Sequence, residues 1–139
     1  MILLAIDPGK KTGVATYAHG ILIEATTIDG DLYRAPPKRP PGLVVCEKPE
    51  MRYAGTGRKA PAGDLITLAI RAGMAVAMLG GGANVEWVTP GRWKGSLPKE
   101  VHHDRVRRAL SPAEGAIFDR SGPDARDAIG LGAWYLTRI

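Results

Sequence analysis

Four acidic residues stand where two apolar segments end and where a third, predicted to be helical, begins. Asp7 follows the apolar run ILLAI, and Glu47 follows LVVC. Asp124 and Asp127 are three residues apart near the start of the segment 121–139, so they share one face of a helix. Carboxylate oxygens suit Mg²⁺ or Mn²⁺ rather than zinc. Two such ions can activate a water and stabilise the leaving oxygen of a phosphodiester.

These acids can act together only if the fold brings them to one place. The segments 2–7 and 43–47 are apolar runs typical of buried strands. In an open sheet with parallel strands, functional groups gather beyond the carboxyl ends of those strands. If the two strands are parallel neighbours, Asp7 and Glu47 come close together, and the pKa of one carboxyl rises because like charges repel. A bound divalent cation would remove this conflict.

The remaining segments predict an α/β fold. Apolar patterning and turn residues predict strands at 13–18, 21–28 and 85–89 and helices at 64–79, about 98–110 and 121–139. His19 and Gly20 form a plausible hairpin turn. The stretches 29–42, 48–63 and 89–100 are rich in glycine, proline or basic residues and are expected to be irregular. This order favours a mixed sheet, its first three strands a meander, with helices packed on it in a single domain, 1–139.

Composition narrows the class of partner and the compartment. The chain has 139 residues, a net charge of +5 and a sequence pI of about 9.6, which favours a polyanionic partner, nucleic acid before membrane. Cys46 is the only cysteine, so the chain can form neither an internal disulfide nor a thiolate zinc site. The first apolar run is too short for a secretory leader, and no run of about 18 uncharged apolar residues is present. We therefore expect an intracellular, cytoplasmic protein.

Basic side chains flank the predicted site. Lys10 and Lys11 follow Asp7 after the turn residues Pro8 and Gly9, and the basic segments 48–62 and 89–100 follow predicted strands. Lys94 is the best candidate to neutralise charge at a phosphate, and Tyr53 could stack on a base. Ordinary solvated surface charge is the alternative for each cation. The predicted DNA-contacting residues are Lys10, Lys11, Lys48, Arg52, Tyr53, Arg58, Lys59, Arg92, Lys94 and Lys99.

Three motifs together resemble a known family. LAIDPGKKTGVA, VVCEKP and PDARDAIGLGAWYL are similar, in order and spacing, to the RuvC-type Holliday-junction resolvases of the ribonuclease H-like superfamily, especially the short phage-type members. VTPGRWKG and the lysine-bearing segment after it resemble that family's fifth strand and following loop. The chain departs from the family at 29–42, which is a proline-rich stretch where the larger bacterial enzymes have a helix.

The resemblance implies both a fold and an activity. The fold would be a ribonuclease H-like mixed sheet of five strands flanked by helices. Asp7, Glu47, Asp124 and Asp127 would be the catalytic, metal-binding acids, holding two Mg²⁺ ions per site, with Mn²⁺ also supporting activity. The expected reaction is symmetric cleavage of four-way junctions, and of other branched DNA, by a homodimer that leaves 5′-phosphate ends.

The segment 64–79 bears on assembly. Arg71 is the only charged residue between Leu65 and Leu79, so apolar side chains lie all round the predicted helix. A helix on the outside of a small domain would keep a polar face. We therefore expect this helix to form a homodimer interface, and a helix buried inside a monomer is the alternative.

The sequence leaves two other functions open and excludes a third. A YqgF-type nuclease of ribosomal RNA precursors also begins with an Asp-Pro-Gly strand end, and a non-catalytic branched-DNA-binding protein would share the basic segments. A sugar- or acetate-kinase-like ATPase needs two large lobes, which 139 residues cannot supply. His102 and His103 are adjacent and so point to different faces of a helix, which argues against a joint metal site.

Overall fold

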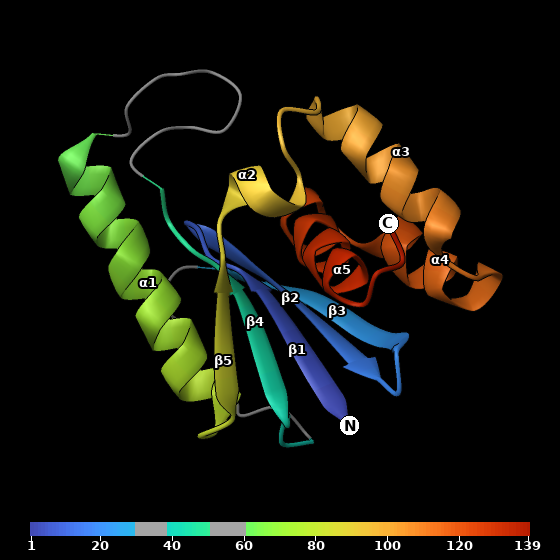
Figure 1. The fold of residues 1–139 in the computed structure, drawn as a ribbon, viewed down its shortest axis with the longest axis horizontal. Helices are drawn as coiled ribbons and strands as arrows, with labels where there is room; N and C mark the ends of the chain where they lie inside the picture. The colour runs from blue at the N-terminus through green and yellow to red at the C-terminus, as the bar shows by residue number, and fades with distance from the viewer. Residues whose placement is uncertain (30–38, 51–60) are drawn as a thin grey trace.

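A mixed five-stranded sheet lies between helices in the computed structural model, which describes residues 1–29, 39–50 and 61–139 (Figure 1). The strands are β1 (Ile2–Asp7), β2 (Lys11–Ala18), β3 (Ile21–Asp29), β4 (Leu43–Glu47) and β5 (Asn84–Val88). The helices are α1 (Ala62–Gly80), α2 (Pro90–Trp93), α3 (Lys99–Ala109), α4 (Pro112–Arg120) and α5 (Pro123–Tyr135). The predicted α/β class is confirmed.

The order of strands in the sheet is β3-β2-β1-β4-β5. β1 pairs antiparallel with β2, and β2 with β3, which confirms the predicted meander. β1 pairs in parallel with β4, and β4 with β5, with Ile6 opposite Cys46. Asp7 and Glu47 are the next residues of the two strands, so they leave the sheet at the same edge, as the sequence predicts.

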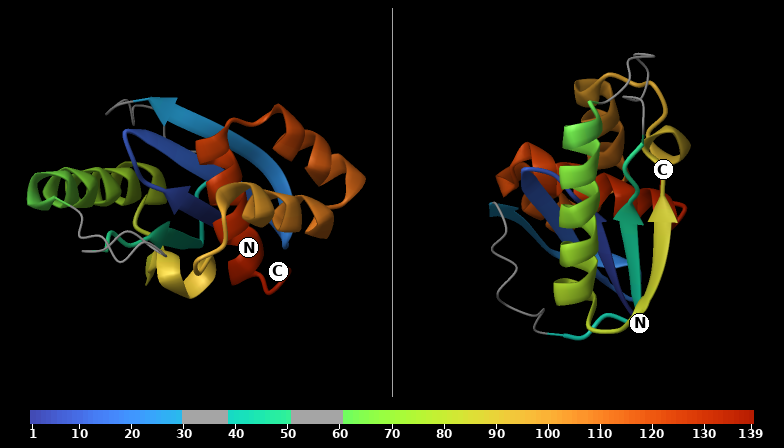
Figure 2. Two further views of the ribbon diagram at one scale, coloured as in Figure 1. Left: turned by 90° about the horizontal axis from the view of Figure 1, so that it is seen from above. Right: turned by 90° about the vertical axis from the view of Figure 1, so that its left-hand side faces the viewer.

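The two faces of the sheet carry separate apolar clusters. On one face, side chains of β1 and β4 such as Ile6 and Cys46 pack on Ala72 and Ala75 of α1. On the other face, Leu3, Ala5 and Val45 pack with residues of α5 and α3. Figure 2 shows α1 and α5 on opposite sides of the sheet. Side chains alternate along a strand, so Asp7 (after Leu3 and Ala5) and Glu47 (after Val45) belong to the face that α5 covers.

α5 lies unusually close to its neighbours because it is rich in glycine and alanine. A Cβ atom on Gly132 would overlap the ring of Tyr17 in β2, and one on Gly130 would lie 2.9 Å from Nε2 of His102 in α3. The Tyr17 hydroxyl donates a hydrogen bond of 2.7 Å to the carbonyl of Ile129. These contacts fix where α5 lies between the sheet and α3.

The structure also corrects several predictions. α4 was not expected, although Ser111, Pro112 and Glu114 form a capping box with proline at the first helical position. The stretch 89–100 is not wholly irregular, because α2 occupies Pro90–Trp93 after a proline that can begin a helix. β2 begins at Lys11 rather than at residue 13. The hairpin at His19 and Gly20 is confirmed, with φ values of 50° and 80°.

By length and composition, α1 alone among the described helices could cross a membrane, with a mean hydropathy of 1.5. The helix contains Asp64 and Arg71, so it is not a run of about 18 uncharged apolar residues, and the sequence expectation that no such run is present still holds. The helix packs one face on the sheet through Ala72, Ala75 and Leu79. Such packing is compatible with a soluble α/β protein, in which one helix face joins the core.

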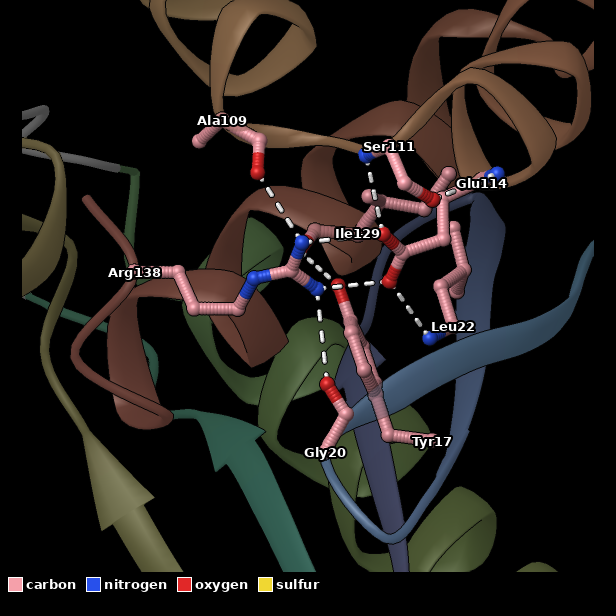
Figure 3. A network of polar contacts seen from close by, with 8 residues as sticks. All are labelled: Tyr17, Gly20, Leu22, Ala109, Ser111, Glu114, Ile129 and Arg138. Carbon is pink, nitrogen blue, oxygen red and sulfur yellow. Dashed lines mark hydrogen bonds and ion pairs between the residues drawn. The ribbon is translucent and has the colours of Figure 1, made fainter.

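A buried carboxylate joins the far end of α5 to α4 and to the β2–β3 hairpin (Figure 3). Glu114 accepts hydrogen bonds from the amides of Leu22 (2.8 Å) and Ser111 (3.0 Å) and from both guanidinium nitrogens of Arg138 (2.6 and 2.9 Å). Arg138 also donates to the carbonyl of Ala109 at 2.9 Å. The Arg138 guanidinium, with these amide donors, lowers the pKa of Glu114 to about 2.

We predict that Glu114→Gln lowers the free energy of unfolding by about 2–4 kcal/mol at pH 7, because Arg138 loses its charged partner in a buried setting. The pKa of Glu114 falls from an ordinary 4.5 to about 2 on folding, so its stabilisation is complete above pH 4.5 and disappears as the pH falls toward 2. Urea unfolding from pH 7 to pH 2 measures both effects.

Glu24→Gln is the matched control, because Glu24 lies exposed on β3. Its free energy of unfolding is expected to stay within about 0.5 kcal/mol of the wild-type value. The difference between the wild type and Glu114→Gln should shrink as the pH falls through the stated window. A difference that is the same at pH 7 and pH 2 would show that the charge of Glu114 is not what stabilises this junction.

Candidate active site

Asp7 and Glu47 meet at the carboxyl ends of β1 and β4. Their carboxyl groups act on each other directly, and the Glu47 side chain favours the protonated form of Asp7. Burial raises the pKa of Asp7 well above its usual range, and the negative charges of Glu47 and Asp127 raise it further, while Lys94 opposes them. Ionised Asp7 therefore costs the fold stability at neutral pH, which is typical of residues kept for chemistry.

Glu47 is held in place from α2. The Trp93 indole nitrogen donates to Glu47 Oε2 at 2.8 Å, and Lys94 Nζ lies 3.1 Å from the same oxygen. Burial lowers the pKa of Lys94, but the charges of Glu47, Asp7 and Asp127 outweigh this effect and the pKa is raised. The Lys94 ammonium therefore stays charged, and three carboxylates from three elements act on it.

Asp127 reaches the same cluster from α5. It is buried, with 7% of its surface exposed. His103 Nε2 lies 2.7 Å from its Oδ1, and Lys99 Nζ lies 2.9 Å from its Oδ2. Both partners come from α3, four residues apart and hence on one face of that helix. Each oxygen of Asp127 thus has its own cationic or donor side chain.

The position of Asp124 is fixed by a contact of its main chain with β2. A Cβ atom on Gly13 would overlap the carbonyl oxygen of Asp124, so the first turn of α5 rests directly on β2. Gly13 pairs with Asp7 across the two strands, which puts Asp124 beside the acids. The first turn of α5 therefore fills the space that the missing Gly13 side chain leaves.

The donor set fits hard divalent cations by its chemistry. Asp7, Glu47 and Asp127 supply carboxylate oxygens, which Mg²⁺ and Mn²⁺ prefer. In the described parts of the chain, no three His, Cys, Asp or Glu side chains form a group that could hold an ion as they stand. Lys94 and Lys99 occupy oxygens of Glu47 and Asp127. Metal binding at these acids would require those two ammonium groups to move aside.

The structure distributes the predicted DNA-contacting residues unevenly. Lys10, Lys11 and Lys48 are exposed near the edge where the acids lie. Lys94 and Lys99 instead bind the acids directly. Arg52, Tyr53, Arg58 and Lys59 lie outside the described residues.

Arg92 lies away from the other predicted contacts. Its guanidinium lies 5.6 Å from the ring centre of Trp134. This pair belongs to a groove of about 450 Å³, lined by Glu86, Arg92, Trp134, Tyr135, Thr137 and Ile139. Within this groove, the Tyr135 hydroxyl donates a hydrogen bond of 2.8 Å to Glu86, so the Glu86 carboxylate already has a partner.

Two members of the cluster were missed from the sequence. Trp93 is buried like a core residue, yet its indole nitrogen donates a hydrogen bond to Glu47. His103 was set aside with His102 as a poor metal pair. The helical spacing of Lys99 and His103 was the available signal, because it puts two potential partners for an acid on one face. Nothing in the sequence says which acid that face meets.

No protein-family model matches the chain, and no curated protein matches it.

We predict that Gly13→Ala lowers the free energy of unfolding by about 2–3 kcal/mol, because the added methyl group must push α5 away from β2. The same displacement should move Asp124 and Asp127 relative to Asp7. Urea unfolding measures the first effect, and the NMR shift of the Tyr17 ring, which lies under Gly132, reports the second.

Gly63→Ala is the matched control, because a Cβ atom there meets nothing within 4 Å. It lies in the first turn of α1, where alanine is the better helix former. This variant should be as stable as the wild type or slightly more so. Equal stability of Gly13→Ala and Gly63→Ala would mean that α5 does not rest on β2 as described.

Proposed function

We propose that this chain is a metal-dependent, structure-specific DNA endonuclease of the RuvC type, with a ribonuclease H-like fold, that cuts four-way junctions and other branched DNA. The observation that carries the proposal is the convergence of Asp7, Glu47 and Asp127. Asp7 and Glu47 follow paired residues of two parallel strands, Lys94 binds Glu47, and the charges of Glu47 and Asp127 act on Asp7. Like charges this close are unfavourable in a purely structural setting. They are expected where oxygen donors bind cations. The likeness of three sequence motifs to that family supports the same reading.

Each residue of the cluster has a role in this proposal. Asp7, Glu47, Asp124 and Asp127 would hold two Mg²⁺ or Mn²⁺ ions, which when bound activate a water and stabilise the leaving oxygen of the phosphodiester. Trp93 keeps Glu47 oriented through its indole hydrogen bond. The Lys94 side chain is 28% exposed, so its ammonium can turn from Glu47 toward a phosphate at the surface.

Net charge and exposed lysines support a DNA partner. The chain carries a net charge of +5, and Lys10, Lys11 and Lys48 lie exposed beside the acids. These side chains would bind the phosphate backbone and set the register of the cut without reading bases. Such an enzyme would work in the cytoplasm, including that of a bacterial host if a phage encodes it.

The outer face of α1 supports a homodimer. Ile66, Ile70, Met74 and Met78 recur every four residues and are 61%, 58%, 37% and 52% exposed. Small residues at 69, 73 and 77 follow the same spacing beside them, which allows two helices to approach closely. An exposed apolar stripe of this length marks an interaction surface. A two-fold dimer through α1 would present two sites to a substrate with two symmetric strands.

The decisive experiment is cleavage of a synthetic four-way junction in Mg²⁺ by the wild type and by Asp7→Asn. The wild type should bind in EDTA, and on addition of Mg²⁺ it should cut two opposing strands symmetrically, leaving 5′-phosphate ends that ligase can seal. Asp7→Asn should bind as well but lose at least about 100-fold in cleavage rate, because one metal ligand is gone. Gel assays of binding and cleavage measure both.

Asp7→Asn also carries its own folding control. Because burial and like charges raise the pKa of Asp7, the neutral asparagine should leave the protein at least as stable as the wild type at pH 7. Loss of cutting in a variant that is no less stable cannot then come from unfolding. Equal cutting by the two proteins would remove Asp7 from the mechanism. Binding without any cutting by the wild type would favour a non-catalytic branched-DNA-binding protein.

We predict that Ile70→Glu converts a dimer to a monomer, because a charge would be buried at the centre of the α1 stripe. Sedimentation velocity measures the change, and the dimer dissociation constant should rise at least about 100-fold. Ile21→Glu is the matched control, since Ile21 is also 58% exposed but lies on β3. A monomeric wild type that floats with lipid vesicles would instead show that α1 meets a membrane.

A further inference from the structure

We propose that His103 is a positioning residue that holds Asp127 in place by a hydrogen bond to Asp127 Oδ1. Asp127 Oδ2 is then the oxygen that releases Lys99 and binds a divalent ion in its place. The inference rests on the proposed nuclease function, because it concerns how one of its metal-binding acids is set. It divides the two oxygens of Asp127 between a permanent partner and a temporary one.

The direction of the His103 hydrogen bond follows from the chemistry of Asp127. An ionised carboxylate can only accept hydrogen bonds, and Asp127 forms an ion pair with Lys99 at 2.9 Å. In the 2.7 Å contact between His103 Nε2 and Asp127 Oδ1, the histidine nitrogen is therefore the donor and the carboxylate oxygen the acceptor. A nitrogen that donates this proton has no lone pair left for a cation, so His103 orients the acid and does not itself ligate through Nε2.

The two partners of Asp127 differ in how firmly they are held. The His103 side chain is 13% exposed and packs edge-to-face on Phe118, with ring centres 6.0 Å apart and an interplanar angle of 89°. The Lys99 side chain is 52% exposed. A solvated lysine pair contributes little stability and costs side-chain entropy to keep in one geometry. An incoming cation would therefore displace Lys99 and leave His103 in place.

The helix that carries His103 is itself fixed on both sides. Arg107, one turn further along the same face, forms a paired ion bridge with Asp119 of α4, with contacts of 2.9 and 3.1 Å. Val106 of α3 is buried and lies against Gly130 of α5. The His103 imidazole thus has a defined position relative to α5. Such outer partners of a ligand typically change metal affinity by about 10–100-fold when removed.

Three variants separate this role from its alternatives. His103→Phe keeps the ring that packs on Phe118 but removes the donor, and His103→Gln restores an amide donor of similar reach. Lys99→Met removes the exposed partner of Oδ2. Mn²⁺ binding to each protein without DNA is measured by electron paramagnetic resonance, with circular dichroism to check folding. Where His103→Phe does not fold, His103→Ala takes its place, because alanine favours the helix.

The expected pattern is specific to positioning. His103→Phe should weaken Mn²⁺ binding about tenfold, His103→Gln should return it to within about threefold of the wild type, and Lys99→Met should not weaken it. The Mg²⁺ concentration for half-maximal junction cleavage should rise in His103→Phe by the same factor, with the rate at saturating Mg²⁺ nearly retained.

Other results would overturn the inference. Wild-type affinity in folded His103→Phe would show that Oδ1 needs no fixed donor. Equal weakness of the glutamine and phenylalanine variants would mean that the imidazole itself is needed, as a ligand or a charge. Weakened binding in Lys99→Met would make Lys99 the permanent partner. If the wild type binds Mn²⁺ and cuts the junction, only this inference has failed, whereas a wild type that does neither removes the proposed function as well.

Discussion

The structure depends on a balance between like charges and the cations placed among them. Asp7, Glu47 and Asp127 come from β1, β4 and α5. Burial raises the pKa of Asp7, and the charges of Glu47 and Asp127 raise it further. Lys94 offsets the first two, and Lys99 and His103 offset the third. Because all three compensating side chains come from α2 and α3 or directly after them, the segment after β5 is as much a part of the site as the strand ends.

This balance needs α5 to lie very close to the sheet. Gly13 in β2 leaves space for the first turn of α5, and Gly132 in α5 leaves space for Tyr17. At the other end, Arg138 ties the chain after α5 to Glu114. A helix held at both ends keeps Asp127 against the strand ends. The absence of side chains at two positions therefore matters as much to the site as the acids do.

The sequence predicts the strands of the sheet more fully than it predicts the side-chain contacts around the acids. Apolar runs that end in Asp7 and Glu47 predict two buried strands, and their shared edge follows from the rule for parallel strands. α4 was missed because it is only 9 residues long and its apolar residues form a weak helical pattern. His103 could be placed on a face of α3 but not against Asp127, since the packing of α3 on α5 is set by Gly130, a contact between residues distant in sequence.

His102 and His103 show how one backbone step separates a core residue from a site residue. His102 is buried against Trp93, with ring centres 5.0 Å apart, and neither of its ring nitrogens has a hydrogen-bond partner among the described residues. Burial lowers its pKa to about 4, so it stays neutral and acts as an apolar spacer. It supports Trp93, whose indole nitrogen holds Glu47. Adjacent histidines on different faces of α3 thus reach two acids by different means, one through packing and the other through a direct hydrogen bond.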